Sequence, residues 1–470
     1  MKPSRDSILG EVILADQVIS EGMSATRRRN TIFLLAGSVA LMMTGFGIIM
    51  PVFARRLGEL GAGVEALGLM TMSFALAQLV AAPFMGALAD RIGRRPLILL
   101  SLATFALANV GFLLADSIQM FVAIRAAEGA LSAGLFPAAM GFVADVSPKR
   151  DRARWVGVIM GSYAAGFFLG PIVGGLLYDS LGFAAPFLAS AIMATLAFIV
   201  AFMIVPETRT AEVRKREQLQ KRRFQERHPG KKESLLESLP RPLRVFAALL
   251  AIDFVMIFAF AFVEPEMIFY VYDDLGWTTV QFGVVVAVYG LTTVLGQGFL
   301  GRLSDQYGRR PMIVFGTLLN AGFYAGLALV TSFPIFLLVA VIAGLGESLV
   351  MPALSAFILD ITNDRHRSRV MGIKESAAAL GGVAGPLLVV AISDYSTPTQ
   401  VFTVAFVLML VTAAIALIFL RVPQKRAVRV DDGALEYATQ RAMTAQAVLH
   451  GIVTAAQVER AKRYPTGSWP

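Results

Sequence analysis

Long uncharged apolar stretches recur along most of the chain, and they limit its possible folds more than any other feature. Each is about 20 residues long, which is the length that an α-helix needs to cross a bilayer. Charged residues, which are 16% of the chain, cluster between the stretches. We therefore expect an all-α membrane protein with twelve transmembrane helices. The spans are expected near 31–53, 67–89, 96–115, 118–146, 155–178, 183–205, 245–272, 280–303, 310–330, 333–361, 369–394 and 399–421.

Basic residues follow a pattern that predicts how the chain crosses the membrane. Basic clusters precede the first span and follow the second and fourth, whereas loops after odd-numbered spans are poor in Lys and Arg, apart from Arg55 and Arg56. Because Lys and Arg stay preferentially on the cytoplasmic side, we expect a multi-pass protein of the cell inner membrane with both termini in the cytoplasm. The net charge of +9 then fits membrane lipids as a partner, and no nucleic acid is expected.

The chain repeats itself at a constant offset of 215 residues (301 − 86). The segment 86–96 recurs as 301–311, with Gly, Asp, Gly, Arg, Arg and Pro at matching positions. The same offset relates further residues of spans two to five to their counterparts: Gly68 and Gly283, Pro137 and Pro352, Asp145 and Asp360, Arg154 and Arg369, Gly170 and Gly385, and Pro171 and Pro386. Two similar six-helix halves in parallel repeat are expected, with the substrate cavity at their interface.

This repeat divides the chain into five expected parts. A cytoplasmic N-terminal segment covers 1–30, and the two six-helix bundles cover 31–205 and 245–421. Between them, 206–244 is a basic cytoplasmic linker, interpreted as a tether rather than a regulatory element. The tail, 422–470, has apolar residues at helical spacing and is expected to form an amphipathic cytoplasmic helix.

Three motifs carry a resemblance to a known family. The segment 86–96 resembles the loop signature between spans two and three of the major facilitator superfamily. Residues 125–129 resemble a signature in span four of drug-exporting members. The glycines of span five resemble the motif of antiporters: Gly157, Gly166, Gly170, Pro171, Gly174 and Gly175. The resemblance implies the drug:proton antiporter, or multidrug efflux, branch.

The resemblance also implies two structural devices. The first is a conformational latch at the cytoplasmic ends of the helices, in which Asp90 accepts hydrogen bonds from a helix start and Arg94 pairs with Asp145. Its full residue set is Gly86, Asp90, Arg94, Asp145, Asp305, Arg309 and Asp360. The second is a groove along the span-five glycines, where a helix of the other half approaches closely.

Charged residues within the spans are candidates for function, because a charge in mid-membrane costs several kcal/mol. Five of them form the candidate site for proton and substrate coupling: Glu347, Asp253, Glu128, Arg125 and Glu264. Arg125 and Glu128 are three residues apart on one helix and are expected to pair, either as a static ion pair or as a pair whose balance shifts on protonation.

Among these acids we expect Glu347 and Asp253 to bind a proton or a cation. The alternative for either is a structural carboxyl satisfied by hydrogen bonds. Lys374 and Glu375 lie near the inner end of span eleven, and we expect them to snorkel toward water without a functional role.

The residue inventory excludes several classes of function. The chain has no Cys, its three His fall in polar segments, and it has no phosphate-binding loop, so no enzyme activity, metal or cofactor is expected. We expect a functional monomer that exports hydrophobic small molecules in exchange for protons by alternating access. The alternatives are an exporter of one metabolite, such as a sugar or a siderophore, an importer or uniporter on the same fold, and a membrane sensor that does not transport.

Overall fold

A computed structural model describes residues 24–148, 151–208, 239–300, 303–363 and 366–420. The expected tail helix, most of the linker and most of the N-terminal segment lie outside the described residues. The same holds for the side chains of Asp90 and Asp305. Within the described residues, twelve helical segments are long and apolar enough to span a membrane, in agreement with the twelve expected spans.

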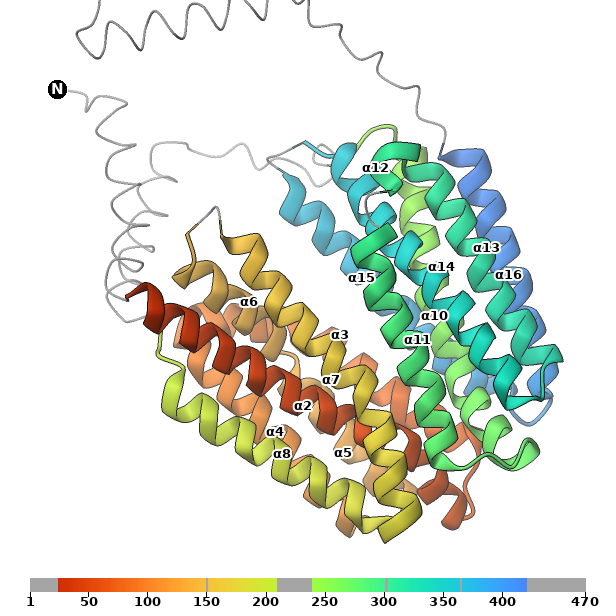
Figure 1. The fold of residues 1–470 in the computed structure, drawn as a ribbon, viewed down its shortest axis with the longest axis horizontal. Coiled ribbons are helices and arrows are strands. Elements are labelled where there is room, and N and C mark those ends of the chain that lie inside the picture. The colour runs from red at the N-terminus through yellow and green to blue at the C-terminus, as the bar shows by residue number, and fades with distance from the viewer. Residues whose placement is uncertain (1–23, 149–150, 209–238, 301–302, 364–365, 421–470) are drawn as a thin grey trace, which may run out of the picture. The chain divides into compact units, whose positions relative to one another are not determined.

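Seven helices build the N-terminal half, drawn from red to yellow-green in Figure 1. They are α2 (Ala25–Glu59), α3 (Val64–Ile92), α4 (Arg94–Leu114), α5 (Ile118–Ser132), α6 (Leu135–Val146), α7 (Arg152–Leu181) and α8 (Ala184–Ile204). The fourth expected span is thus two helices separated by a turn at Ala133 and Gly134. Pro137 lacks the N–H that an unbroken helix would donate to the Ala133 carbonyl. Its counterpart Pro352 lies inside the unbroken α14, so the break is particular to the N-terminal half.

The C-terminal half, green to blue in Figure 1, repeats this order. Its elements are α10 (Leu243–Phe269), the π-helical turn η2 (Tyr270–Asp274), α11 (Thr279–Leu300), the short α12 (Leu303–Tyr307), α13 (Arg309–Leu329), α14 (Phe333–Asp360), α15 (Arg367–Ile392) and α16 (Pro398–Phe419). Span seven therefore continues past its expected end through η2, and span eight ends at Leu300.

Glycines at repeated positions form equivalent turns in the two halves. Gly93 and Gly308 precede α4 and α13 with φ angles of 118° and 93°. Gly61 and Gly276 lie in the loops before α3 and α11, with φ angles of 74° and 64°. Only glycine adopts such angles at low cost, so the 215-residue offset appears in the backbone as well as in the sequence.

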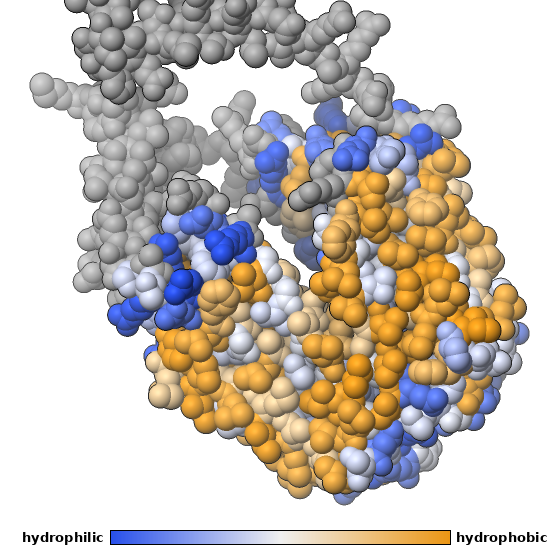
Figure 2. All heavy atoms as spheres, in the orientation of Figure 1, coloured by the Kyte–Doolittle hydropathy of each residue, from blue (hydrophilic) through white to orange (hydrophobic). Residues whose placement is uncertain are grey.

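The outer faces of the helices are apolar. Leu107, Phe299 and Leu329 are 71%, 78% and 82% exposed, respectively. Figure 2 shows hydrophobic residues along the flanks of the helices and hydrophilic residues at their ends. Apolar cover of this extent is typical of a lipid-facing surface, since soluble proteins rarely expose large contiguous apolar patches.

The halves contact each other through α7 with α11 and through α3 with α15. At Gly283 of α11, an added Cβ would lie 2.6 Å from the Pro171 carbonyl carbon of α7. We call the helix ends near residues 206–244 the linker end and the opposite ends the far end. Gly175 of α7 and Thr279 of α11 are a close pair at the far end, where an added glycine Cβ would lie 2.7 Å from the threonine carbonyl.

Candidate functional site

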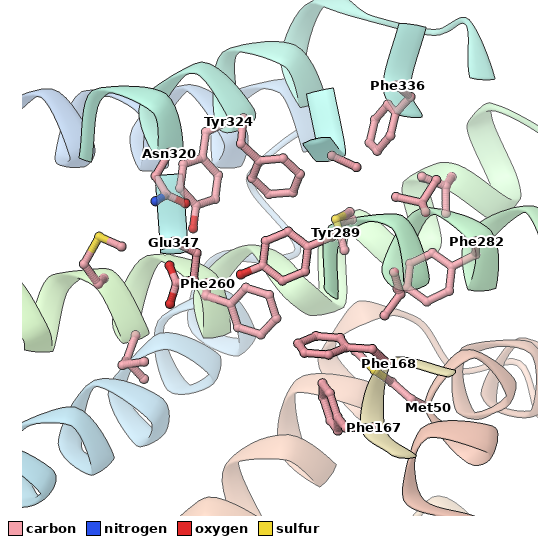
Figure 3. A pocket seen from close by; sticks show the side chains of 18 of the residues that line it. Met50, Phe167, Phe168, Phe260, Phe282, Tyr289, Asn320, Tyr324, Phe336 and Glu347 are labelled. Atoms are coloured by element: carbon pink, nitrogen blue, oxygen red, sulfur yellow. The ribbon is translucent and has the colours of Figure 1, made fainter. Parts of the chain in front are cut away.

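A cavity of about 490 Å³ lies mainly among the helices of the C-terminal half (Figure 3). Its volume suits a small organic molecule. Most lining residues come from the segment between α10 and α14: Met256, Ile257, Phe260, Met267, Val271, Trp277, Phe282, Val285, Val286, Tyr289, Asn320, Phe323, Tyr324, Phe336, Ala340, Glu347 and Met351. The N-terminal half adds Met50, Tyr163, Phe167 and Phe168. The cavity is therefore shared by the halves, as expected, but very unequally.

Glu347 is the charged side chain among the described residues that line the cavity. It lies half-buried near the middle of α14. Figure 3 shows its carboxylate beside Asn320, with the hydroxyl ends of Tyr324 and Tyr289 turned toward it. The Asn320 amide donates to the Gly316 carbonyl over 3.2 Å, which fixes that side chain. The polar end of the cavity is thus an acid with hydrogen-bonding neighbours.

Aromatic rings form much of the rest of the wall, together with Met, Val, Ile and Ala side chains. Trp277 meets Phe336 edge-on, with ring centroids 4.9 Å apart. Phe168 of α7 meets Tyr289 of α11 edge-on at 6.0 Å, and the Phe168 ring sits directly on Gly290. A side chain at residue 290 would occupy the position of that ring, so Gly290 lets the N-terminal half reach the cavity.

Asp253 does not line the cavity but is almost completely buried, at 1% exposure, within α10. Its Oδ1 lies 3.5 Å from the Nζ of Lys374 on α15, and Lys374 Nζ also donates to Glu375 over 3.1 Å. The prediction that Lys374 snorkels to water is wrong. Lys374 is 7% exposed, because α15 packs on α10 and turns this side chain inward.

Arg125 and Glu128 form the expected pair, with Arg125 Nη1 2.8 Å from Glu128 Oε2. Both residues are buried, and the guanidinium lies 4.6 Å from the ring centroid of Phe74. Neither residue lines the cavity, so this pair and Glu347 occupy different places in the fold.

Glu264 also lies outside the cavity lining, although it follows Phe260 by one helical turn on α10. Arg125 of the N-terminal half interacts with it electrostatically. The five predicted coupling residues therefore form two groups. Arg125 and Glu128 lie in the N-terminal half, with Glu264 close to them across the interface. Asp253 and Glu347 lie in the C-terminal half, where the charge of Asp253 acts on the Glu347 carboxyl group.

The predicted latch residues come together at the linker end. Arg94 Nε lies 3.7 Å from Asp145 Oδ2 in the N-terminal half. The counterparts Arg309 and Asp360 are 3.1 Å apart. Gly86 has no tight neighbour, since an added Cβ would meet no atom within 4 Å.

Sequence reasoning missed the acid at the start of α4. The Glu207 carboxylate accepts the backbone N–H groups of Arg94 and Arg95, over 3.1 and 3.2 Å. Thr208 donates to Asp145 over 2.8 Å. A carboxylate at a helix N-terminus satisfies otherwise unpaired N–H groups and complements the helix dipole. Residues 207–208 thus bind the start of α4 and Asp145 at the linker end of the N-terminal half, where Asp90 was expected to accept hydrogen bonds from a helix start.

The span-five glycines mostly contact their own half, which corrects the expected groove. An added Cβ at Gly170 would lie 2.5 Å from the Thr44 carbonyl oxygen of α2, and Gly166 and Gly174 also pack on α2. Gly175 faces α11 of the other half, beside Pro171, and Gly157 meets nothing within 4 Å.

Comparison with known proteins decides the family. The profile of the Major Facilitator Superfamily matches residues 35–272 and 246–456, which together span most of the chain. The chain belongs to the major facilitator superfamily. It is accordingly a multi-pass membrane protein and a transporter, and transporters of this family carry small molecules and typically work as monomers.

Relatives of this transporter include drug-resistance proteins. The tetracycline resistance protein, class C, of Escherichia coli is 28% identical, in a match that covers 79% of this chain and 92% of that protein. The class G protein of Vibrio anguillarum is 31% identical over 74% of this chain and 86% of its own length. Multidrug resistance protein 2 of Bacillus subtilis is 26% identical, with shares of 78% and 89%.

Solved structures share the transporter's fold. A bacterial homologue of the human lysosomal transporter Spinster, in an inward-facing and occupied conformation, aligns with a TM-score of 0.68 at 16% identity. That alignment covers 86% of this chain and 98% of the homologue. The human organic anion transporter MFSD10 aligns with a TM-score of 0.59 at 23% identity, over 83% and 99% of the two chains.

Residues at the far end of this transporter join its halves directly. Arg55 Nη2 donates to the Trp277 carbonyl over 2.6 Å, and its guanidinium lies 4.1 Å from the ring centroid of Tyr272. The Tyr272 hydroxyl donates to the Pro51 carbonyl over 2.9 Å. Because the Trp277 side chain lines the cavity, these contacts lie immediately beside it. In the sequence, Arg55 was noted only as an exception to the scarcity of Lys and Arg after odd-numbered spans.

Proposed function

We propose that this transporter exports hydrophobic small molecules, cationic ones among them, in exchange for protons by alternating access. The observation that carries the proposal is the aromatic cavity with the Glu347 carboxyl group at its polar end. Flexible apolar and aromatic walls accept ligands of varied shape. The resistance proteins among the relatives support export of drug-like molecules.

Competition at Glu347 supplies the coupling in this proposal. An ionised carboxylate surrounded by aromatic rings is costly when it is alone and favourable beside a cationic ligand. A proton neutralises the same group, so ligand and proton exclude each other. Protonation from the outer side releases the ligand, and loss of the proton to the cytoplasm restores the site.

The far-end contacts provide the gate for alternating access. If the linker end faces the cytoplasm, as the loop charges predict, Arg55, Tyr272 and Trp277 close the cavity toward the outside. Release outward then requires these contacts to break while the linker ends of the two halves approach each other. A ligand pressing on the Trp277 side chain acts directly on one of the gate's three residues.

The composition of the wall argues against a sugar as substrate. Sugars need several hydrogen-bonding side chains, whereas the described lining is dominated by Phe, Met, Val and Ile around Glu347, Asn320 and the tyrosines. An importer or uniporter would use the same cavity. It differs from an antiporter in how ligand flux responds to an imposed proton gradient.

The test uses purified protein in liposomes with an imposed pH gradient, and tetraphenylphosphonium as a probe whose own charge does not titrate. Wild type should move the probe against the proton flow, and its affinity should depend on pH between about 5 and 8, where buried acids of proteins can exchange protons. Glu347→Gln resembles the protonated acid in shape and should lose gradient-driven transport while retaining some binding.

Glu266→Gln is the matched control, since it removes an acid of α10 that does not line the cavity. It should keep the wild-type pH profile. If Glu347→Gln transports at the wild-type rate with an unchanged profile, the proton site lies elsewhere, with Glu128 as the next candidate.

A further inference from the structure

The C-terminal half contains a buried ion pair that the cavity does not use directly. Asp253 and Lys374 are 1% and 7% exposed, and their charged atoms lie 3.5 Å apart between α10 and α15. Both Asp253 oxygens lack any hydrogen-bond partner among the described residues. Asp253 and Lys374 thus form a buried salt bridge between α10 and α15. Such an arrangement contributes little to stability, because desolvation of both groups opposes their attraction.

The internal repeat indicates that the fold does not need this pair. The offset of 215 residues maps Lys374 onto Ile159. The equivalent glycines Gly170 and Gly385 pack on the carbonyls of Thr44 and Phe258, so α2 and α10 correspond at an offset of 214 residues (258 − 44) and the counterpart of Asp253 is Val39. Both counterparts are buried between α2 and α7, which pack on each other as α10 and α15 do. The same helix packing is thus achieved without charges in the other half.

The pair lies next to the cavity. Asp253 precedes Met256 and Ile257 by three and four residues, which places it one helical turn from two lining residues on the same side of α10. Charged groups that face Asp253 are Lys374 and Glu375 on α15 and Glu347 on α14. Helix α16 carries no charged residue, and α2 and α3 carry theirs only near their ends.

We propose that Lys374 is a positioning residue for proton coupling: it holds Asp253 in an ion pair, so that Glu347 is the one carboxyl group beside the cavity that exchanges its proton with the ligand. This inference rests on the proposed function. Two acids, one lining the cavity and the other one helical turn from its lining residues, would otherwise compete for protons and for a cationic ligand, and the number of protons moved per ligand would vary. A fixed cation on α15 removes one acid from that competition.

The test measures tetraphenylphosphonium affinity against pH in purified full-length variants that elute as a single folded species. For a group that exchanges one proton with the ligand, affinity changes by about tenfold per pH unit over the titration range. Wild type should show this slope, and Glu347→Gln should lose it. In the double variant Glu347→Gln/Lys374→Met, Asp253 has lost its partner and becomes exchangeable, so the slope of about tenfold per pH unit should return. Adding Asp253→Asn should abolish it again.

Lys374→Arg is the control that keeps the cation, and Glu347→Gln/Lys374→Arg should stay independent of pH. One result would overturn the inference alone: pH-independent binding by Glu347→Gln/Lys374→Met, which leaves Lys374 a purely structural role. A pH-dependent binding by Glu347→Gln would overturn both the inference and the coupling role of Glu347, and Glu347→Gln/Asp253→Asn then tells whether Asp253 or another acid exchanges the proton. If binding by the wild-type protein did not depend on pH, the proposed function would be overturned, and the inference with it.

Discussion

In this transporter, the role of each buried charged residue depends on the group that compensates its charge. Arg125 is compensated by Glu128 at 2.8 Å and by the faces of aromatic rings, whereas Lys374 is compensated by Asp253 at 3.5 Å. Each pair occurs in one half only, since the repeat counterparts of Arg125 and Glu128 are Ala340 and Ala343. The halves share a fold but not a charge pattern, which is what a division of labour between them requires.

At this scale we expect Glu128→Gln to destabilise the protein. It leaves the Arg125 guanidinium buried without its carboxylate, and removing one partner of a buried pair costs about 3–5 kcal/mol. Thermal unfolding of the purified variant should show a clearly lowered midpoint. The double variant Arg125→Met/Glu128→Gln carries no buried charge and should recover part of the loss. A wild-type midpoint for the single variant would contradict this account of the pair.

At the scale of elements, close helix packing depends on which face of a helix each small residue occupies. Gly166, Gly170 and Gly174 recur every four residues and admit α2, whereas Gly175 and Gly283 lie where α7 meets α11. The first set therefore builds the N-terminal bundle, and the second set forms the contact between halves.

We expect Gly170→Leu to reduce the amount of folded protein rather than to uncouple transport. Its side chain would displace the α2 backbone at Thr44, 2.5 Å from an added Cβ. Gly157→Leu is the matched control on the same helix, where an added Cβ meets nothing within 4 Å, and it should accumulate normally. Fluorescence-detected size-exclusion of tagged variants measures this. If both variants gave equal yields of folded protein, the close contact between α2 and α7 at Gly170 would not be needed for folding.

The linker-end pair of Arg94 and Asp145 leads to a kinetic prediction. Arg94→Ala removes the partner of Asp145 outside the cavity, so tetraphenylphosphonium affinity should stay within about twofold while the transport rate falls severalfold. Initial rates in liposomes and equilibrium binding separate the two quantities. Arg91→Ala, at the end of α3, is expected to matter less. If Arg94→Ala mainly reduced the affinity for tetraphenylphosphonium rather than the transport rate, the interpretation of this pair as a latch would be wrong.

At the scale of the whole molecule, the proposed alternating access requires the two halves to exchange contacts between the far end and the linker end. Arg55 joins the halves through the Trp277 carbonyl and the Tyr272 ring. We expect Arg55→Gln to shift the population toward a form open at the far end, because the shorter neutral side chain loses both contacts. The chain has no Cys, so cysteine pairs can be introduced without removing any.

Spin labels on Ser180→Cys and Thr278→Cys, both exposed and in different halves, report this opening as a distance. The Arg55→Gln variant should show a larger share of long distances than wild type. Arg56→Gln is the control, since Arg56 pairs with Glu59 of its own helix at 2.9 Å. An unchanged distribution in Arg55→Gln would mean that other far-end contacts suffice to hold the halves together.

The sequence by itself determined the features that depend on local spacing or on the repeat. Hydrophobic length placed the spans, the 215-residue offset indicated two halves, and three-residue spacing predicted the pair of Arg125 and Glu128. The motif also predicted the pair of Arg94 with Asp145, and the latch set included Arg309 and Asp360, which form the equivalent pair in the other half. These properties follow from helix geometry and need no knowledge of neighbouring helices.

Only the tertiary structure decided which faces of the helices meet. The rotation of α15 against α10 buries Lys374 beside Asp253, and the rotation of α7 turns Gly170 toward α2. The same packing gathers the cavity around Glu347 in the C-terminal half and leaves Arg125 outside it. In a helix that is apolar on all sides the hydrophobic pattern has no preferred face, so sequence periodicity carries little information about these rotations. Side-chain packing across the bundle supplies it.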